Sequence, residues 1–147
     1  MKLLKKEGKK VIKGNETILV VDDVEGVRNI AKKQLERLGY KVILAEDGNE
    51  AINRYEEKKG EIDLVLLDMI MPGLAGKETY FELKKINPEV KVLLISGYSQ
   101  DGKVIEILQE GFLGFIQKPF RLKELSKIIS ETLKKRVYPD DYMGSQE

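Results

Sequence analysis

The feature that most constrains the fold of this chain is a repeated alternation of short apolar runs with longer amphipathic segments. The apolar runs are rich in Val, Ile and Leu and mostly continuous, which is typical of strands buried on both faces of a parallel sheet. They occupy residues 17–21, 41–45, 63–67, 91–95 and 114–117. Apolar residues recur at helical spacing in residues 27–38, 51–55, 80–86, 104–108 and 122–133. We therefore predict an α/β fold, a doubly wound five-stranded parallel sheet with helices on both faces.

Helix-ending residues support this division of the chain. Gly39, Gly60 and Gly111 follow three of the amphipathic segments, at positions where a left-handed residue commonly closes a helix. Asn87 and Pro88 follow a fourth segment, and proline cannot continue a helix. Each predicted strand is therefore separated from the next by a helix with its own stop signal or by a turn.

The composition excludes several classes of function. At 147 residues the chain has room for one ordinary domain, and its net charge of +1 gives no field that would attract nucleic acid. The absence of Cys and His excludes disulfides, thiolate chemistry, Cys/His zinc sites and a Ser-His-Asp triad. No apolar run approaches the roughly 20 residues of a membrane span. We expect a cytoplasmic protein with no membrane segment in this chain.

The charged ends of the chain differ from its middle. Residues 1–15 are rich in lysine, and residues 138–147 show no periodicity. We therefore expect a basic N-terminal tail or linker over residues 1–15, a folded domain over 16–137 and a C-terminal tail over 138–147.

Chemically reactive side chains follow four of the predicted strands. Ligands of an open parallel sheet bind beyond the carboxyl ends of its strands. The residues at those ends are Asp22 and Asp23, Asp68, Ser96, and Lys118 with Pro119. Each has a structural alternative when taken singly: an Asp after a strand commonly caps the next helix, Ser before Gly forms turns, Lys lies at the surface, and Pro starts helices. Asp23 in particular is a candidate for starting the helix at Val24.

As a group, these residues indicate a site for a metal ion and a phosphoryl group. Three carboxylates on one edge repel one another unless a cation neutralises them. An all-oxygen donor set favours a hard ion, Mg²⁺ first, with Mn²⁺ as an alternative. Lys118 and Ser96 would then contact the phosphoryl oxygens. Asp68, alone at the central strand, is the candidate nucleophile that forms an acyl phosphate, which leaves Asp22 and Asp23 for the metal.

The motifs VVDD (20–23), LLDMIMPG (66–73), ISG (95–97) and QKPF (117–120) resemble those of the receiver domain of two-component response regulators. The resemblance covers about residues 16 to 137. It implies a flavodoxin-like strand order of 2-1-3-4-5 in a three-layer (βα)5 sandwich. It also implies a signalling domain that catalyses only its own phosphorylation and dephosphorylation, rather than an enzyme with an external substrate.

The resemblance assigns roles to the residues at the strand ends. It implies that Asp68 accepts a phosphoryl group from a histidine kinase or a histidine phosphotransfer domain. It implies that Asp23 binds Mg²⁺ directly, that Asp22 does so largely through water, and that Asp68 and the main-chain carbonyl of Ile70 are further ligands.

The remaining implied roles concern the phosphoryl oxygens and the response to phosphorylation. Ser96 and Lys118 would hold the phosphoryl oxygens, and the peptide bond between Lys118 and Pro119 would be cis. Phe115 occupies the position of the switch aromatic, whose turning inward would change the surface of the fourth helix, fifth strand and fifth helix. A plain core role for Phe115 fits the sequence equally well.

Several alternatives remain open at this point. The phrases SGYS and GFIQKPF resemble receivers attached to hybrid sensor histidine kinases, with the lysine-rich start as a linker, but a free-standing single-domain regulator also fits. A haloacid-dehalogenase-like phosphatase would need an Asp-x-Asp pattern where this chain has adjacent acids. An FMN binder would need a phosphate-cradling first loop. We expect no direct contact with nucleic acid, because the basic run lacks aromatic partners and a recognition module.

Overall fold

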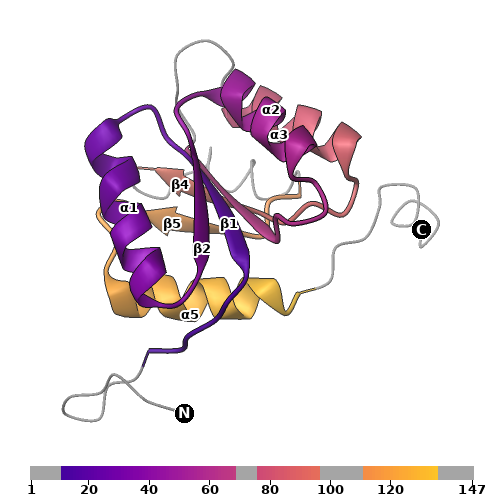
Figure 1. The fold of residues 1–147 in the computed structure, drawn as a ribbon. Helices are drawn as coiled ribbons and strands as arrows, with labels where there is room; N and C mark the ends of the chain where they lie inside the picture. Colours follow the sequence, from indigo (N-terminus) through magenta and orange to yellow (C-terminus); the bar gives the residue numbers. More distant parts are fainter. Residues whose placement is uncertain (1–10, 69–75, 97–110, 136–147) are drawn as a thin grey trace.

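Strands and helices alternate along the chain as the sequence predicts (Figure 1). The structure is a computed structural model that describes residues 11–68, 76–96 and 111–135. Its elements are β1 (Thr17–Val21), α1 (Glu25–Arg37), β2 (Lys41–Ala45), α2 (Gly48–Glu57), β3 (Leu64–Asp68), α3 (Gly76–Ile86), β4 (Val92–Ser96), β5 (Gly114–Gln117) and α5 (Leu122–Leu133). The helix expected over residues 104–108 lies outside the described residues.

The five strands form one parallel sheet in the order β2-β1-β3-β4-β5, which confirms the predicted topology. Strands β3 and β4 each lie one residue later than predicted. Asp68 pairs with Ile95, and Ser96 pairs with Gln117, so both polar residues end their strands instead of following them. Because β1 and β3 are adjacent in the sheet, Asp22 and Asp68 lie next to each other at the carboxyl ends of these strands.

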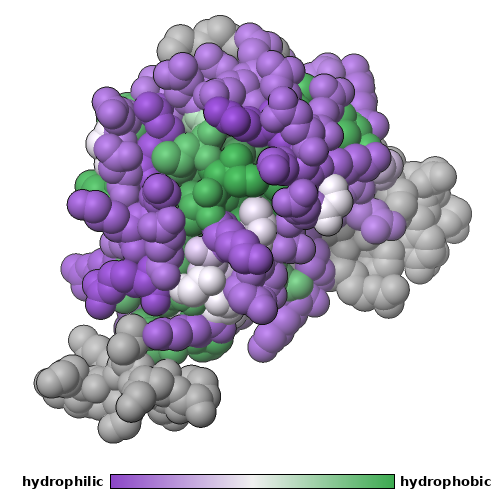
Figure 2. All heavy atoms as spheres, viewed as in Figure 1, coloured by the Kyte–Doolittle hydropathy of each residue, from purple (hydrophilic) through white to green (hydrophobic). Residues whose placement is uncertain are grey.

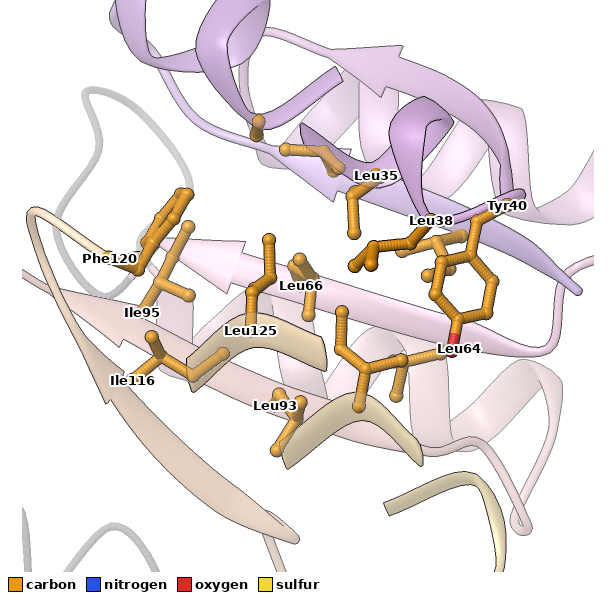
Figure 3. Packing of buried hydrophobic residues seen from close by; sticks show 14 of the residues in the cluster. Leu35, Leu38, Tyr40, Leu64, Leu66, Leu93, Ile95, Ile116, Phe120 and Leu125 are labelled. Atoms are coloured by element: carbon orange, nitrogen blue, oxygen red, sulfur yellow. The ribbon is translucent and has the colours of Figure 1, made fainter. Parts of the chain in front are cut away.

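The helices form two layers over the sheet. Helices α1 and α5 cover one face, and α2 and α3 cover the other (Figure 1). The cluster under α1 and α5 includes Leu35, Leu66 and Leu125, all fully buried (Figure 3). The cluster on the opposite face includes Tyr55 and Tyr80, each about 1% exposed. With two covered faces, the central strands are buried throughout, which explains their continuous apolar runs.

The predicted helix ends are correct at two positions and wrong at a third. Gly39 has a φ of 98° directly after α1, as a left-handed closing residue requires. Asn87 donates its backbone N–H to Leu83 and ends α3 before Pro88. Gly60 does not have a positive φ, because α2 already ends at Glu57 and Lys58 is its cap. Gly111 has a φ of 118°, but the segment before it is outside the described residues.

Part of the segment predicted as an N-terminal tail packs on the domain. Val11 is 8% exposed within the cluster under α1 and α5, and Ile12 exchanges hydrogen bonds with the Ser126 hydroxyl of α5. Gly14 donates its N–H to the carbonyl of Leu38. Residues 11–14 therefore contact the domain that the sequence predicts to begin at residue 16.

The surface of the domain is mostly hydrophilic. A hydrophobic area near the middle of the face in Figure 2 lies over the edge strand β2, where Val42, Ile43 and Leu44 are half-buried. Each helix within the described ranges is too short or too polar to cross a membrane.

Candidate functional site

Asp22 is a buried acid held rigidly at the end of β1. Its backbone N–H extends the pairing with β2 by donating to the carbonyl of Ala45 at 3.1 Å. Its Oδ1 accepts the N–H of Val24 at 2.9 Å. Its side chain is 0% exposed, whereas the next residue, Asp23, is exposed. The two adjacent acids therefore have different surroundings, one inside the protein and one facing solvent.

The alternative role of Asp23 as the cap of the next helix is wrong. The N-cap of α1 is Val24, and no side chain caps that helix end. The carboxylate of Asp22 satisfies the Val24 N–H instead, through a turn two residues long. Asp23 is thus left without a structural role at the helix start.

Asp68 joins these acids in one cluster, which we call the acidic cluster (Asp22, Asp23 and Asp68). Asp68 ends β3 and is 5% exposed. One carboxylate oxygen from each of the three acids lies within 4.8 Å of the others. The sheet order produces this convergence, because β1 and β3 are neighbours whose carboxyl ends lie at the same edge.

Lys118 brings a single positive charge into the acidic cluster from the end of β5. Its Nζ lies 2.7 Å from Asp22 Oδ2 and 3.5 Å from Asp68 Oδ1. The contact with Asp22 Oδ2 is a close, buried ion pair, and the contact with Asp68 is a longer one. One ammonium therefore faces three carboxylates.

The pKa values follow from this arrangement. Burial, reinforced by the Asp22 charge, raises the pKa of Asp68 to about 6, although Lys118 opposes the shift. Burial alone would lower the pKa of Lys118, but the Asp22 and Asp68 carboxylates outweigh it and raise that pKa. Lys118 thus stays charged. Asp68 is ionised at neutral pH although burial and the neighbouring Asp22 charge disfavour its carboxylate form.

The donor set of the acidic cluster fits a hard divalent cation. The three donors are carboxylates, and the described residues bring no nitrogen or sulfur ligand to them. A cation would also neutralise charge on Asp22 Oδ2, a fully buried carboxylate oxygen that faces Lys118. The residues present therefore match a magnesium site better than a zinc or iron site.

Of four other residues named from the sequence, two are placed in full and two are placed in part or not at all. The main chain of Ser96 ends β4, but its side chain lies outside what the structure describes, as does Ile70. The peptide bond between Lys118 and Pro119 is cis, as the resemblance implies. Phe115 lies in β5, half-buried against the cluster under α2 and α3.

Two polar side chains of α1 contact the site and were not singled out from the sequence. Arg28 Nη1 donates to the main-chain carbonyl of Asp22 at 2.7 Å. Gln34 Nε2 lies 3.4 Å from the carbonyl of Phe120, which follows the cis peptide. Their positions one and three turns into an amphipathic helix are a weak sequence signal, because polar residues there ordinarily face solvent.

Comparison with known proteins identifies a family and several similar chains. The model of the response regulator receiver domain matches residues 18–130. The chemotaxis protein CheY of Bacillus subtilis is 34% identical over 79% of this chain and 96% of its own length. The sensor kinase CckA of Brucella abortus is 36% identical over 85% of this chain but only 13% of its own length. The chain thus spans a small part of some relatives and nearly all of others.

A solved structure supports the same relationship. The response regulator TrrA of Thermotoga maritima, in complex with Mg²⁺-BeF, is 32% identical and has a TM-score of 0.70. The match covers 80% of this chain and 98% of that protein. The similarity therefore extends over the whole domain and is not limited to the acidic motifs.

Proposed function

Because this chain belongs to the response regulator receiver domain family of two-component systems, we propose that Asp68 accepts a phosphoryl group from a phosphohistidine. The observation that carries this proposal is the placement of Asp68, buried at the end of the central strand beside Asp22 and Lys118. A buried carboxylate with a raised pKa and a lysine 3.5 Å away fits a nucleophile better than a structural acid.

In the transfer, an oxygen of the Asp68 carboxylate attacks phosphorus and forms an acyl phosphate. The bond between phosphorus and the histidine nitrogen breaks, and the imidazole of the partner leaves with a proton. The Lys118 ammonium offsets the charge on the phosphoryl oxygens, and the Ser96 hydroxyl donates a hydrogen bond to one of them. Phe115 then turns inward, which changes the surface near β5.

The proposed cofactor is Mg²⁺, with Mn²⁺ as a substitute. Asp22, Asp23 and Asp68, together with the main-chain carbonyl of Ile70, would hold it. When bound, the ion neutralises carboxylate charge and phosphoryl charge together. The chain's own residues orient the nucleophile and limit the access of water, since Asp22 and Asp68 are both buried.

Acetyl phosphate labelling tests this function. With Mg²⁺, one phosphoryl group per chain is expected on Asp68, and Asp68→Asn should abolish the label. Asp63→Asn, at the end of the domain where β3 begins, is the matched control and should be labelled as the wild type is. Turnover of a phosphate ester without a stable adduct would instead support the phosphatase alternative, and a label that survives Asp68→Asn would refute the assignment.

We propose that the partner is a histidine kinase or a histidine phosphotransfer domain that docks beside the acidic cluster. Val24 and Ile30 of the α1 region are apolar residues with 49% and 56% of their surface exposed. A shallow apolar pocket next to them is lined by Val27, Ile30, Lys118, Pro119 and Phe120. Since Lys118 belongs to both the pocket and the site, a protein docked there would lie close to Asp68.

Ile30→Glu tests the docking face without touching the site. We expect phosphotransfer from the partner to fall roughly tenfold, the effect of losing one central apolar contact. Labelling by acetyl phosphate should not change. Phe81→Glu on α3 is the matched control, because Phe81 is also an exposed apolar residue, at 42%. Equal effects of the two substitutions would count against the proposed face.

For the larger context, we propose that this domain is the receiver part of a hybrid sensor histidine kinase in the cytoplasm. The similarity to CckA supports this assignment, whereas the similarity to CheY over nearly its whole length supports a free-standing regulator. We place the domain at residues 16–137, with residues 11–15 packed on it. Sequencing the reading frame upstream decides between the two: a kinase module in frame supports the hybrid, and a stop codon refutes it.

A further inference from the structure

The contact of Arg28 with the acidic cluster is to its backbone. Nη1 of Arg28 donates to the main-chain oxygen of Asp22 at 2.7 Å, in a partly buried hydrogen bond. The backbone N–H of Arg28 also donates to the carbonyl of Val24, the first intrahelical bond of α1. Arg28 is therefore tied to both ends of the turn that connects β1 to α1.

This contact completes the restraint of Asp22. The N–H of Asp22 is bonded to Ala45, its Oδ1 to the N–H of Val24, and its carbonyl to Arg28. Only Oδ2 remains, facing Lys118. Because α1 lacks a side-chain cap, the hydrogen bond from Arg28 to the Asp22 carbonyl adds a side-chain restraint from the helix to this turn.

The charge of Arg28 and its geometry predict opposite effects on a cation. A guanidinium at the main-chain oxygen of Asp22 carries a positive charge that repels Mg²⁺, so an arginine that acted only as a charge would weaken metal binding, and its removal would strengthen it. An arginine that acts by orienting the turn would strengthen metal binding, and its removal would weaken it. Residues that orient metal ligands commonly contribute 10–100-fold to affinity.

We propose that Arg28 is a positioning residue of the phosphoacceptor site, which orients Asp22 for Mg²⁺ by holding its main-chain carbonyl. This inference rests on the proposed function, since it presumes that the acidic cluster binds Mg²⁺. It adds a residue from α1 to a site whose other members all lie at strand ends.

The test compares Arg28→Met with Arg28→Lys by calorimetric titration with Mg²⁺ alone. Arg28→Met is expected to raise the dissociation constant for Mg²⁺ roughly tenfold in spite of removing a repelling charge. Arg28→Lys, which retains one donor, is expected to recover part of that loss. Arg37→Met is the matched control in the same helix, because Arg37 is exposed at its last turn, and it should bind Mg²⁺ as the wild type does.

Two further measurements separate positioning from a purely structural role. At saturating Mg²⁺ the rate of labelling by acetyl phosphate should be close to that of the wild type, while the half-saturating Mg²⁺ concentration rises. A variant that melts earlier but needs no more Mg²⁺, or one that binds Mg²⁺ equally or more tightly, overturns the inference. If Arg28→Met does not fold, Arg28→Gln replaces it with the same expected direction and the same contradicting result.

The proposed function and this inference fail in different ways. A wild-type chain that does not bind Mg²⁺ overturns both. A wild-type chain that binds Mg²⁺ and is labelled on Asp68, together with an Arg28→Met variant of unchanged Mg²⁺ affinity, overturns only the role of Arg28.

Discussion

Polar groups have different partners at the two ends of the sheet. At the end where the strands begin, Asp63 Oδ2 accepts the N–H of Thr17 at 2.9 Å, and the Tyr55 hydroxyl accepts from Asn87 at 2.9 Å. At the end where the strands finish, Asp22 and Asp68 are buried together and share one lysine. The first end satisfies its polar groups locally, whereas the second concentrates negative charge that its own residues do not balance.

This contrast separates polar residues that serve the fold from those that serve function. Asp63 is exposed and its hydrogen bond joins β1 to the segment before β3. The carboxylates of Asp22 and Asp68 instead share one ammonium, that of Lys118, and burial of like charges is unfavourable. The buried acidic cluster therefore lowers the stability of the folded chain. Binding of a cation and a phosphoryl group would raise that stability again.

The largest effect on stability is expected from Lys118→Met. The substitution removes the ammonium that lies within 3.5 Å of both Asp22 and Asp68, so without Mg²⁺ at pH 8 it should cost about 3 to 4 kcal/mol. Lys91→Met, at the opposite end, removes one hydrogen bond to the carbonyl of Leu133 and should cost about 1 kcal/mol. Denaturant unfolding measures both, and equal costs would remove the distinction between the two ends.

A gain in stability is expected from Asp68→Asn in the absence of Mg²⁺. Burial raises the pKa of Asp68 to about 6, so the folded chain binds an extra proton between about pH 4 and 6 and loses stability as the pH rises through that window. A shift of about two units corresponds to about 3 kcal/mol. Because Lys118 also loses one of its two partners, we expect a gain of about 2 kcal/mol at pH 8.

The pH dependence of that gain is its control. It should vanish below about pH 4, where the wild-type carboxyl is protonated in both states. Unfolding curves at pH 4 and pH 8 measure the difference between variant and wild type. A gain of the same size at both values would mean that the charge of Asp68 is not the cause.

The smallest effect is expected from Asp63→Ala. Loss of the hydrogen bond to Thr17 should cost about 1 kcal/mol, because this acid is exposed and bonded to one N–H. Mg²⁺ should stabilise this variant by as much as it stabilises the wild type. A change in Mg²⁺ affinity would mean that the two ends of the sheet are coupled.

Much of this molecule follows from patterns that are local in sequence. The convergence of Asp22, Asp23 and Asp68 could be predicted because a parallel sheet brings its carboxyl ends together, whereas the strand order came from the resemblance to receiver domains. The direct contact of Lys118 with Asp22 was not predicted, because the apolar periodicity of the sequence does not determine distances between side chains on different strands. Arg28, Gln34 and the packing of Val11 were missed for the same reason: each depends on which face of the molecule a side chain meets.

The most direct test of this account is calorimetric titration of Mg²⁺ into the wild type and into Asp22→Asn/Asp23→Asn. We predict one Mg²⁺ per wild-type chain and none for the double variant, which should also resist labelling by acetyl phosphate. The double variant should nevertheless unfold at the same denaturant concentration as the wild type without Mg²⁺, or at a higher one. A double variant that binds Mg²⁺ as the wild type does, or one that cannot fold, would contradict the claim that these acids serve the site and not the fold.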